Sequence, residues 1–281
     1  MKKTTLRALI QASFFAFSNG YLKGFSQGKI FTGNTKFFCT PGLNCYSCPG
    51  ALASCPIGSL QAILTTREFT ISFYLLGFFM IFGSLLGRCI CGFLCPFGFF
   101  QDLLFKIPCI KKIAHLPGEK FLRSIRFFIL AIFVILLPLF VIDITGIGEP
   151  WFCKFICPVG TLEGGIPLVL ANEALRKTLG FLYYWKLALL IGIILLSIIL
   201  FRPFCRYLCP LGAIYGIFNK FSLYRFSINP ATCTQCGLCK KNCKLGIDVF
   251  KNPNSIDCIR CGDCIEGCPQ NAIEKHFLRF K

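Results

Sequence analysis

The sequence predicts an all-α membrane bundle of four transmembrane helices, arranged as two tandem pseudo-symmetric halves and followed by a small cysteine-rich α+β domain. The composition is apolar, because 55% of the 281 residues are hydrophobic and 15% are charged, whereas about a quarter of the residues in soluble domains are charged. Long apolar runs recur up to residue 225 and then stop, while the 20 cysteines recur in short phrases along the chain. These observations divide the chain into residues 1–107, 108–225 and 226–281.

Four apolar stretches are each near the length of about 20 residues that spans a bilayer. The first follows several basic residues, so a cleaved signal peptide is the alternative to a first helix that stays in place. Because no small-residue cleavage site follows its apolar part, we expect the uncleaved helix. The basic residues inside the last two stretches, Arg123, Arg126 and Lys186, are expected to snorkel toward the nearer surface. The four stretches are Leu6–Phe25, Phe69–Leu86, Leu122–Ile142 and Phe181–Phe201.

The charge of +18 is distributed unevenly between the segments that these four helices would connect. Residues 1–7, 87–126 and 202–225 would share one side and carry 14 basic against 2 acidic residues, whereas residues 23–68 and 143–186 carry 8 against 5. Positive loops face the cytoplasm, so both termini are expected in the cytoplasm. The chain is expected to cross the inner membrane several times. No basic run is interleaved with aromatic residues, so the charge indicates membrane lipid and anionic partners and not nucleic acid.

The C-terminal residues contain the most specific pattern, in "CTQCGLCKKNCKLG" and "CIRCGDCIEGCPQNAI". Both read Cys-x2-Cys-x2-Cys-x3-Cys, the spacing of bacterial ferredoxins with two 4Fe-4S clusters, in which the fourth cysteine of each run serves the other cluster. Lys244 stands where proline is usual. Structural zinc favours pairs of cysteines, and disulfides are improbable in a cytoplasmic segment. The predicted ligand sets are Cys233, Cys236, Cys239 and Cys268 for one cluster, and Cys243, Cys258, Cys261 and Cys264 for the other.

Four further phrases place a proline directly after a cysteine: "CPGALASCPIG" (48–58), "CGFLCPFG" (91–98), "CKFICPVG" (153–160) and "CRYLCPLG" (205–212). Proline is favoured as the first residue of a helix, which makes the preceding cysteine the N-cap. There, backbone N–H groups and the helix dipole are expected to lower the thiol pKa and to stabilise an anion such as a ligated cluster. The glycine that follows leaves room for a bulky neighbour, and nearby Arg88, Arg202, Arg206 and Lys154 add positive charge.

Two thiolates do not hold a cluster, so each phrase needs a partner phrase. The order of helices and phrases repeats after about 110 residues, and two halves related by an axis along the membrane normal would bring like phrases together. This pairing predicts an inner site of Cys91, Cys95, Cys205 and Cys209 and an outer site of Cys48, Cys55, Cys153 and Cys157. It leaves over Cys39, Cys45, Cys89 and Cys109. Three alternatives are that Cys45 replaces Cys48 in the outer site, that the outer thiols of the first half hold a cluster alone, or that these cysteines are merely structural.

The stretches "GRCICGFLCPFGFFQDLL" and "CRYLCPLGAIYGIFNKFS", together with the two-cluster tail, resemble a known family. It is the membrane-bound polyferredoxins, typified by the NapH-like subunit of periplasmic nitrate reductase systems and by the ferredoxin part of nitrous-oxide-reductase accessory proteins. The resemblance covers nearly the whole chain. It implies a role in carrying electrons between cytoplasmic or quinone donors and extracytoplasmic reductases.

The predicted function is therefore electron transfer through two tail clusters and two more in the membrane part, from a cytoplasmic donor to an extracytoplasmic flavin- or metal-containing redox protein. The chain is expected to be a subunit of a membrane oxidoreductase complex and not an enzyme by itself. A redox-sensing regulator or a metal-centre maturation factor with the same clusters is the alternative. A quinol dehydrogenase has little support, because Asp143 and Glu149 form no quinone pocket, and His115 and His276 cannot provide a haem within the bilayer. Clusters at opposite surfaces about 30 Å apart would need re-entrant segments or a partner's cofactor between them.

Overall fold

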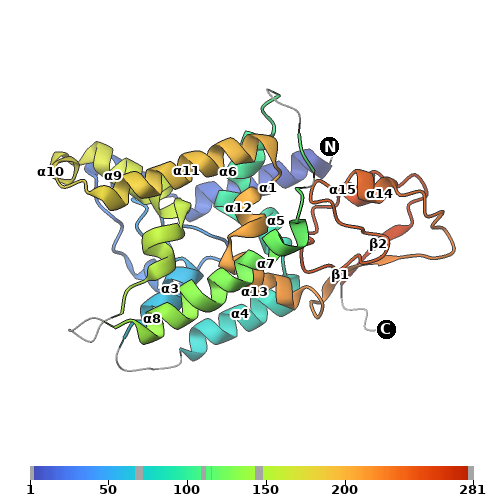
Figure 1. Cartoon of the computed structure of the whole chain (residues 1–281), viewed down its shortest axis with the longest axis horizontal. Helices are drawn as coiled ribbons and strands as arrows, with labels where there is room; N and C mark the ends of the chain where they lie inside the picture. Colours follow the sequence, from blue (N-terminus) through green and yellow to red (C-terminus); the bar gives the residue numbers. More distant parts are fainter. Residues whose placement is uncertain (1–2, 67–71, 109–111, 115, 143–147, 278–281) are drawn as a thin grey trace.

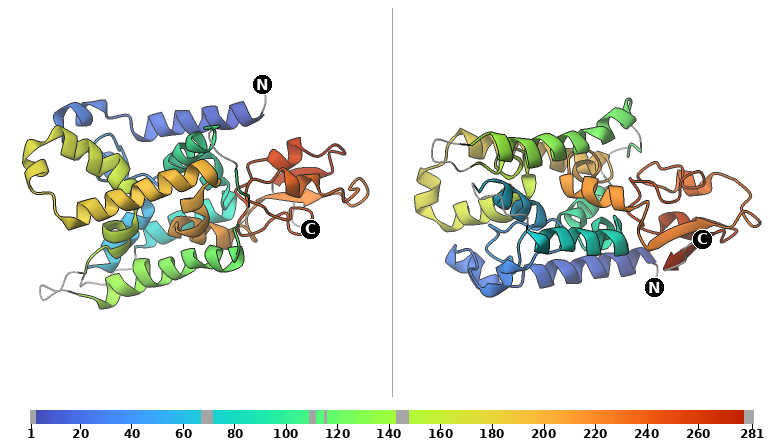
Figure 2. Two further views of the ribbon diagram at one scale, coloured as in Figure 1. Left: turned by 45° about the horizontal axis from the view of Figure 1, so that its top comes forward. Right: turned by 90° about the horizontal axis from the view of Figure 1, so that it is seen from below.

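The computed structural model describes residues 3–66, 72–108, 112–114, 116–142 and 148–277. Four helical segments run along the long axis of the molecule in all views (Figures 1 and 2). They are α1 (Lys3–Ser18), α4 (Phe73–Leu86), α7 with η2 and α8 (Glu119–Ile129, Leu130–Leu136 and Leu137–Phe140) and α11 (Phe181–Ile199). Shorter elements connect them: α2 (Leu22–Gln27), η1 (Asn34–Phe37), α3 (Pro56–Leu64), α5 (Cys89–Phe93), α6 (Pro96–Phe105), η3 (Phe152–Ile156), η4 (Gly160–Gly165), α9 (Ile166–Ala171), α10 (Glu173–Lys177), α12 (Pro203–Tyr207) and α13 (Pro210–Phe218).

The prediction of four transmembrane helices in tandem halves is wrong. Within the described residues, two helices are long and apolar enough to cross a membrane, Glu119–Phe140 and Phe181–Ile199. Helix α4 has 14 residues, which at 1.5 Å per residue reach only about 21 Å of the roughly 30 Å of hydrocarbon. The apolar helical part of α1, Leu6–Ser18, is also short.

Polar and glycine residues end the two short helices. At the end of α1, the Ser18 side chain donates to the Phe14 carbonyl and the Asn19 side chain donates to the Phe15 carbonyl. The helix therefore ends there, and the chain turns toward α2. In α4 the Ser72 hydroxyl accepts from the Leu75 N–H and starts the helix. Gly87, with φ of +53°, ends α4 in a conformation that other residues avoid. The first predicted residues of that span, 69–71, lie outside the described residues.

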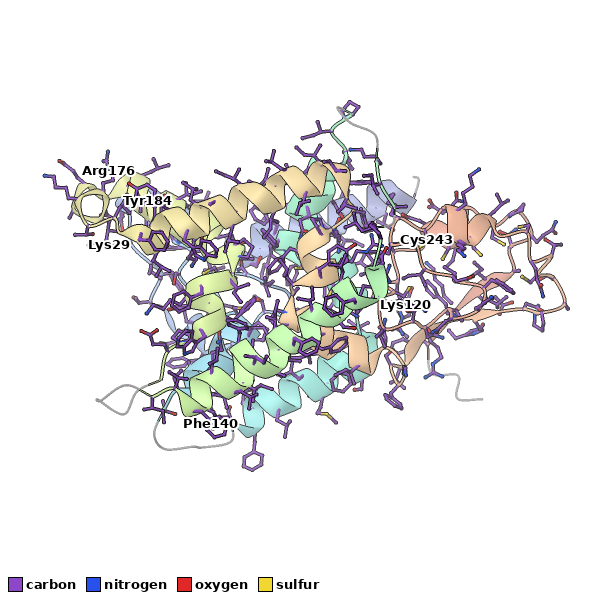
Figure 3. The ribbon with its side chains drawn as sticks, viewed as in Figure 1. Lys29, Lys120, Phe140, Arg176, Tyr184 and Cys243 are labelled. Atoms are coloured by element: carbon purple, nitrogen blue, oxygen red, sulfur yellow. The ribbon has the colours of Figure 1, made fainter. Side chains whose placement is uncertain are left out.

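The two long helices expose their apolar side chains. Only 22% and 17% of their apolar stretches are buried inside the protein, and Phe128, Phe140, Phe181 and Leu195 are all exposed. An exposed apolar surface of this kind fits lipid contact better than water. In Figure 3, Lys120 marks the end of the helix Glu119–Phe140 that lies beside the C-terminal lobe, and Phe140 marks its opposite end.

The basic residues of these helices do not snorkel as expected. Arg126 is fully buried, and its Nη2 lies 2.6 Å from Oδ1 of Asp257. Lys186 donates through Nζ to the Cys153 carbonyl at 3.0 Å. Both cations are therefore held by partners inside the protein.

Residues after 223 form a small lobe at one end of the molecule (Figures 1 and 2). Strand β1 (Tyr224–Ile228) pairs antiparallel with β2 (Ile273–Phe277), with Phe226 opposite Lys275. Two short helices, α14 (Leu238–Lys241) and α15 (Asp263–Glu266), lie between the strands in sequence. The beginning of α1 lies on the side of the helices that is nearer to this lobe (Figures 1 and 2). We call residues 224–277 the tail.

The tail is fixed to the helices by buried charges and close backbone contacts. Asp257 forms ion pairs with Arg123 at 2.6 Å and Arg88 at 3.6 Å as well as with Arg126. Arg260 donates to the Leu86 carbonyl at 3.0 Å. A charge buried in this way must keep its partners, because breaking such a pair leaves an uncompensated charge. The tail and the helices therefore pack as one unit around these residues.

Candidate metal centres

The four Cys-Pro phrases start helices as predicted. Helices α3, α6 and α13 begin at Pro56, Pro96 and Pro210, each with the preceding cysteine as N-cap. Pro158 is also helical. The N–H of Gly98 donates to Cys95 Sγ, and the N–H of Gly212 donates to Cys209 Sγ, both at 3.4 Å. The helix N-termini thus point at the sulfur atoms.

These caps do not lower the thiol pKa values, contrary to the prediction. Burial raises the pKa of Cys55 to about 12, although the nearby amides of Gly58 and Ile57 oppose the shift. Burial also raises the pKa of Cys205 to about 11, against the opposing charge of Arg202. Desolvation outweighs the N–H groups because these thiols lie in the protein core. Without a bound cation, the thiols would therefore stay protonated at neutral pH.

The structure brings together the four cysteines of the predicted inner site. Burial raises the pKa of Cys95, and the Cys205 and Cys91 thiols are near enough to raise it further. Cys209 is affected in the same way by Cys205, Cys91 and Cys95. All four thiols are buried. We call Cys91, Cys95, Cys205 and Cys209 the inner group.

The arginine that precedes each phrase of the inner group donates a hydrogen bond to the other phrase. Arg88, which precedes the first phrase, donates to the Cys205 carbonyl at 3.0 Å, and Arg202, which precedes the second, donates to the Cys91 carbonyl. A Cβ on Gly212 would lie 3.1 Å from Arg88 Nη2, and one on Gly98 would lie 3.1 Å from Arg202 Nη1. The glycine of each phrase therefore makes room for the arginine of the other.

Asp102 and Gln101 hold this arrangement in place, and sequence reasoning did not find either residue. Arg202 donates twice to the Asp102 carboxylate, at 2.6 Å to each oxygen, and Arg7 also pairs with it. Burial alone would raise the pKa of Asp102, but Arg202 and Arg7 outweigh it and keep the pKa below its ordinary value. Gln101 donates to Cys205 Sγ at 3.1 Å. Their only sequence signal is two adjacent polar residues in an apolar run.

A second group of thiols lines a cavity of about 220 Å³. Its cysteines are Cys45, Cys55, Cys153 and Cys157, which we call the outer group. Cys48, which the sequence placed in the outer site, does not line this cavity, and its Sγ lies 3.5 Å from Asn19 Oδ1. Cys45, the alternative that the irregular spacing had left open, lines the cavity.

Polar residues surround the outer group. The Cys45 N–H donates to Glu163 at 2.7 Å, and burial raises the pKa of this carboxyl to about 8. The Cys153 N–H donates to Gln61 at 3.3 Å. Lys186 and Lys154 line the cavity and supply positive charge.

The inner and outer groups are neighbours, not sites at opposite surfaces. The backbone N–H of Leu43 reaches the Cys95 thiol, and that of the next residue, Asn44, reaches the Cys55 thiol. Two consecutive amides therefore touch both groups. Tyr215 is completely buried beside them, and burial followed by the Cys91 and Cys55 thiols raises its pKa. The expected gap of a bilayer thickness is absent, because the Cys-Pro helices lie inside the protein.

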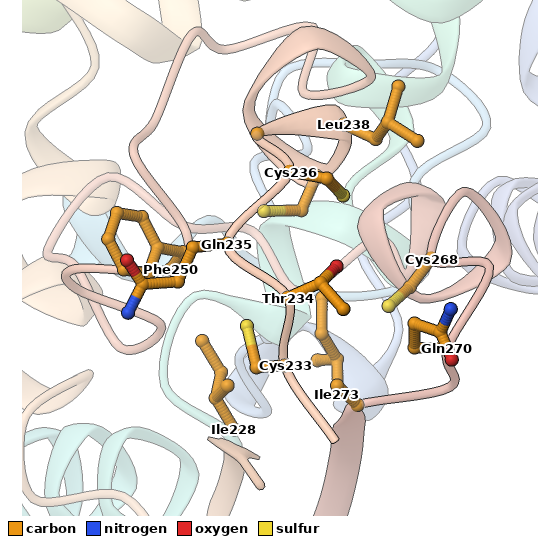
Figure 4. A pocket seen from close by; sticks show the side chains of 13 residues that line it. Ile228, Cys233, Thr234, Gln235, Cys236, Leu238, Phe250, Cys268, Gln270 and Ile273 are labelled. Carbon is orange, nitrogen blue, oxygen red and sulfur yellow. The ribbon is translucent and has the colours of Figure 1, made fainter. Parts of the chain in front are cut away.

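The structure places the tail cysteines near one another in two groups, with the same members as the predicted sets. Cys233, Cys236, Cys239 and Cys268 line one pocket, shown in Figure 4 with the labelled sulfurs of Cys233, Cys236 and Cys268 around it. We call them the first tail group. In the second tail group, burial raises the pKa of Cys264, and the Cys258, Cys261 and Cys243 thiols raise it further. Figure 3 shows Cys243 on the side of the tail that faces the helices.

The remaining cysteines have different surroundings. Cys89 lies between two groups: burial raises its pKa to about 12, and its electrostatic neighbours include both Cys91 and Cys261. Cys39 Sγ lies 3.5 Å from Ser59 Oγ. Cys109 lies outside the described residues, as do Asp143 and His115. Glu149 pairs with Lys154, and His276 pairs with Glu274 at 3.2 Å in the tail.

The donor sets fit iron-sulfur clusters. Each group offers four thiols, the ligand set of a 4Fe-4S cluster. In the part of the chain that the structure describes, no three or more His, Cys, Asp or Glu side chains are arranged to hold one metal ion. The thiolates of a cluster bind separate iron atoms. Iron would also supply the positive charge that these buried thiols need to ionise.

Comparison with known proteins gives the same class. The family described as "4Fe-4S binding domain" matches residues 68–117, 128–167 and 183–229. These segments contain the whole inner group and two cysteines of the outer group. The chain is thus a ferredoxin-type iron-sulfur protein of the electron-transport class.

Three relatives narrow this class. Two are uncharacterized proteins of Methanocaldococcus jannaschii, one 30% identical over 67% of this chain and 72% of its own length, the other 27% identical over 69% and 66%. The ferredoxin-type protein NapH of Haemophilus influenzae is 35% identical over 32% of this chain and 37% of its own length. No solved structure matches the chain. The chain belongs to the NapH-like family of ferredoxin-type 4Fe-4S proteins.

Proposed function

We propose that this chain carries single electrons across the cytoplasmic membrane, between a cytoplasmic donor and an extracytoplasmic flavin- or metal-containing redox protein. The observation that supports it is a series of neighbouring thiol groups from the second tail group to the outer group. Cys89 has electrostatic neighbours in both the second tail group and the inner group, and the amides of Leu43 and Asn44 reach the inner and the outer group. A 4Fe-4S cluster in each group supplies one-electron chemistry at a potential that the protein sets.

The ligands in this proposal are the four cysteines of each group, with Cys45 and not Cys48 in the outer group. Cys236 is exposed, so the first tail group is where a soluble donor would meet the chain. The inner group is buried and surrounded by Arg88 and Arg202, which offset the negative charge of ligated thiolates. These residues keep water away and hold the ligands in place.

Membrane placement follows from the two long apolar helices. Glu119–Phe140 and Phe181–Ile199 would cross the bilayer, and two crossings return the chain to the side on which it started. Both chain ends would then be cytoplasmic, with the tail, as the positive-inside rule also favours. The chain would work within a membrane complex that includes its extracytoplasmic partner.

Iron and sulfide counting of protein purified without oxygen is the first test. Four clusters predict about 16 iron atoms per chain. A count of about 8 would confine the clusters to the tail and refute the route through the helices.

Transfer itself can be followed in liposomes that contain the purified chain. A reductant outside and an oxidising dye trapped inside should react in the presence of the chain. Cys209→Ser, in the inner group, should abolish this reaction, while Cys48→Ser should leave it intact. Equal rates with the unaltered chain and with Cys209→Ser would contradict the proposal.

A further inference from the structure

Asn44 is a buried amide without a partner in the described fold. Its exposed fraction is 0%, and neither Oδ1 nor Nδ2 has a hydrogen-bond partner. An unpaired buried polar group costs free energy, and such groups in folded proteins normally find partners. A leucine of similar size would avoid this cost. Both polar atoms of Asn44 are therefore available to a partner outside the polypeptide.

The position of Asn44 indicates what that is. It lines the cavity of the outer group beside Cys45 and Cys55, and its own N–H reaches the Cys55 thiol. Apart from the cysteines, Asn44 is the one buried polar side chain among the described residues that line this cavity. Tyr46 is exposed, and Ser47, Lys154 and Lys186 are half-buried. The lining cations have carbonyl or carboxylate partners already: Lys186 donates to Cys153 and Lys154 pairs with Glu149.

We infer that the Asn44 side-chain amide donates a hydrogen bond from Nδ2 to a sulfur atom of the cluster held by the outer group, and that it thereby raises the reduction potential of this cluster. The inference rests on the proposed function. The reduced form of a cluster carries one more negative charge than the oxidised form, so a donor to sulfur stabilises the reduced form more.

With the Asn44 donor, the cluster of the outer group would be easier to reduce than with the four cysteine ligands alone. Its backbone N–H and its side chain act on the same group, while the preceding amide, from Leu43, acts on the inner group. The side chain therefore changes one group selectively. Electrons arriving from the tail would be drawn from the inner group toward the outer group.

Two variants of the full-length chain test this inference in redox titrations followed by electron paramagnetic resonance. Asn44→Leu removes the donor, and Asn44→Asp keeps the shape but, when ionised, has no N–H group. Both should lower the midpoint potential of one cluster and leave the others unchanged. Thr161→Val is the matched control, because Thr161 is also buried with an unpartnered hydroxyl but does not line the cavity. It should shift no potential.

The outcomes separate this inference from the proposed function. A full iron count with unchanged potentials in both Asn44 variants would overturn the role of Asn44 and leave the proposed function standing. An unaltered chain that lacks the outer cluster, with about four iron atoms fewer than expected, would refute the assignment of the outer group itself. If Asn44→Leu loses its outer iron, the isosteric Asn44→Asp decides by the same titration.

Discussion

Gly92 is the position where a single methyl group should separate the tail from the helices. It lies in α5, and a Cβ built on it would stand 2.5 Å from the Ile259 carbonyl oxygen. Since ordinary contacts of a Cβ begin at 3.4 Å, Gly92→Ala would push this carbonyl away by about 0.9 Å, the difference between these two distances. Overpacking of this kind costs about 1–3 kcal/mol. Ile259 follows Cys258, so the second tail group would move with it.

Gly77→Ala is the matched control. Gly77 is also helical, in α4, but a Cβ there has nothing within 4 Å, and alanine favours a helix over glycine by about 0.5–1 kcal/mol. We expect Gly92→Ala to lower the denaturant midpoint of the iron-loaded protein and Gly77→Ala to hold or raise it. Gly92→Ala should also slow the reduction of the inner group by electrons that enter at the tail.

The measurement follows cluster absorbance during unfolding in detergent, and rapid mixing with a reductant for the transfer rate. Hydrogen exchange at residues 256–260 reports the contact directly, and it should be faster in Gly92→Ala alone. Equal midpoints and equal exchange for the two variants would refute the argument that this contact fixes the tail.

Three further predictions concern the buried charges and the thiols. Asp102→Asn should destabilise the protein by about 3–5 kcal/mol at neutral pH, since it leaves Arg202 buried without a carboxylate. Because the folded pKa of Asp102 is lowered, its contribution is present above about pH 4 and is lost as the pH falls through the folded value, so acid should narrow the gap between variant and wild type in denaturant melts. Cys45→Ser should lose about four iron atoms while Cys48→Ser keeps them, and the reverse result would restore Cys48 to the outer group. Cys209→Ser should remove one cluster signal from the paramagnetic spectrum and spare both tail signals; an unchanged spectrum would contradict the inner-group assignment.

Local spacing explains what the sequence could predict. A proline is favoured as the first residue of a helix, so the helix starts at the last cysteine of the four phrases followed from residues that are adjacent in the chain. The tail sets also depend on spacings of two or three residues. By contrast, the outer group combines two phrases about 100 residues apart, and the first phrase is irregular. Only the fold shows that Cys45 lines the cavity while Cys48 turns toward Asn19.

Long-range partners explain what the sequence could not predict. Apolar length suggested four membrane-crossing helices, but Ser18 and Ser72 set the ends of α1 and α4 through hydrogen bonds that hydropathy does not register. Helix-dipole reasoning predicted lowered thiol pKa values, yet it could not include the burial that reverses them. Asn44 and Asp102 are single polar residues in apolar surroundings, and their roles depend on contacts made across the fold.

The exchange of arginines between the two inner phrases has a consequence for biogenesis. Arg88 is held by a carbonyl more than 100 residues later, and Arg202 reaches back in return. A ribosome must therefore release the chain well past Cys209 before either half of this site acquires its final neighbours. The inner group of thiols can therefore form only late in synthesis, and a chain that ends before Cys205 would leave Arg88 without this carbonyl partner.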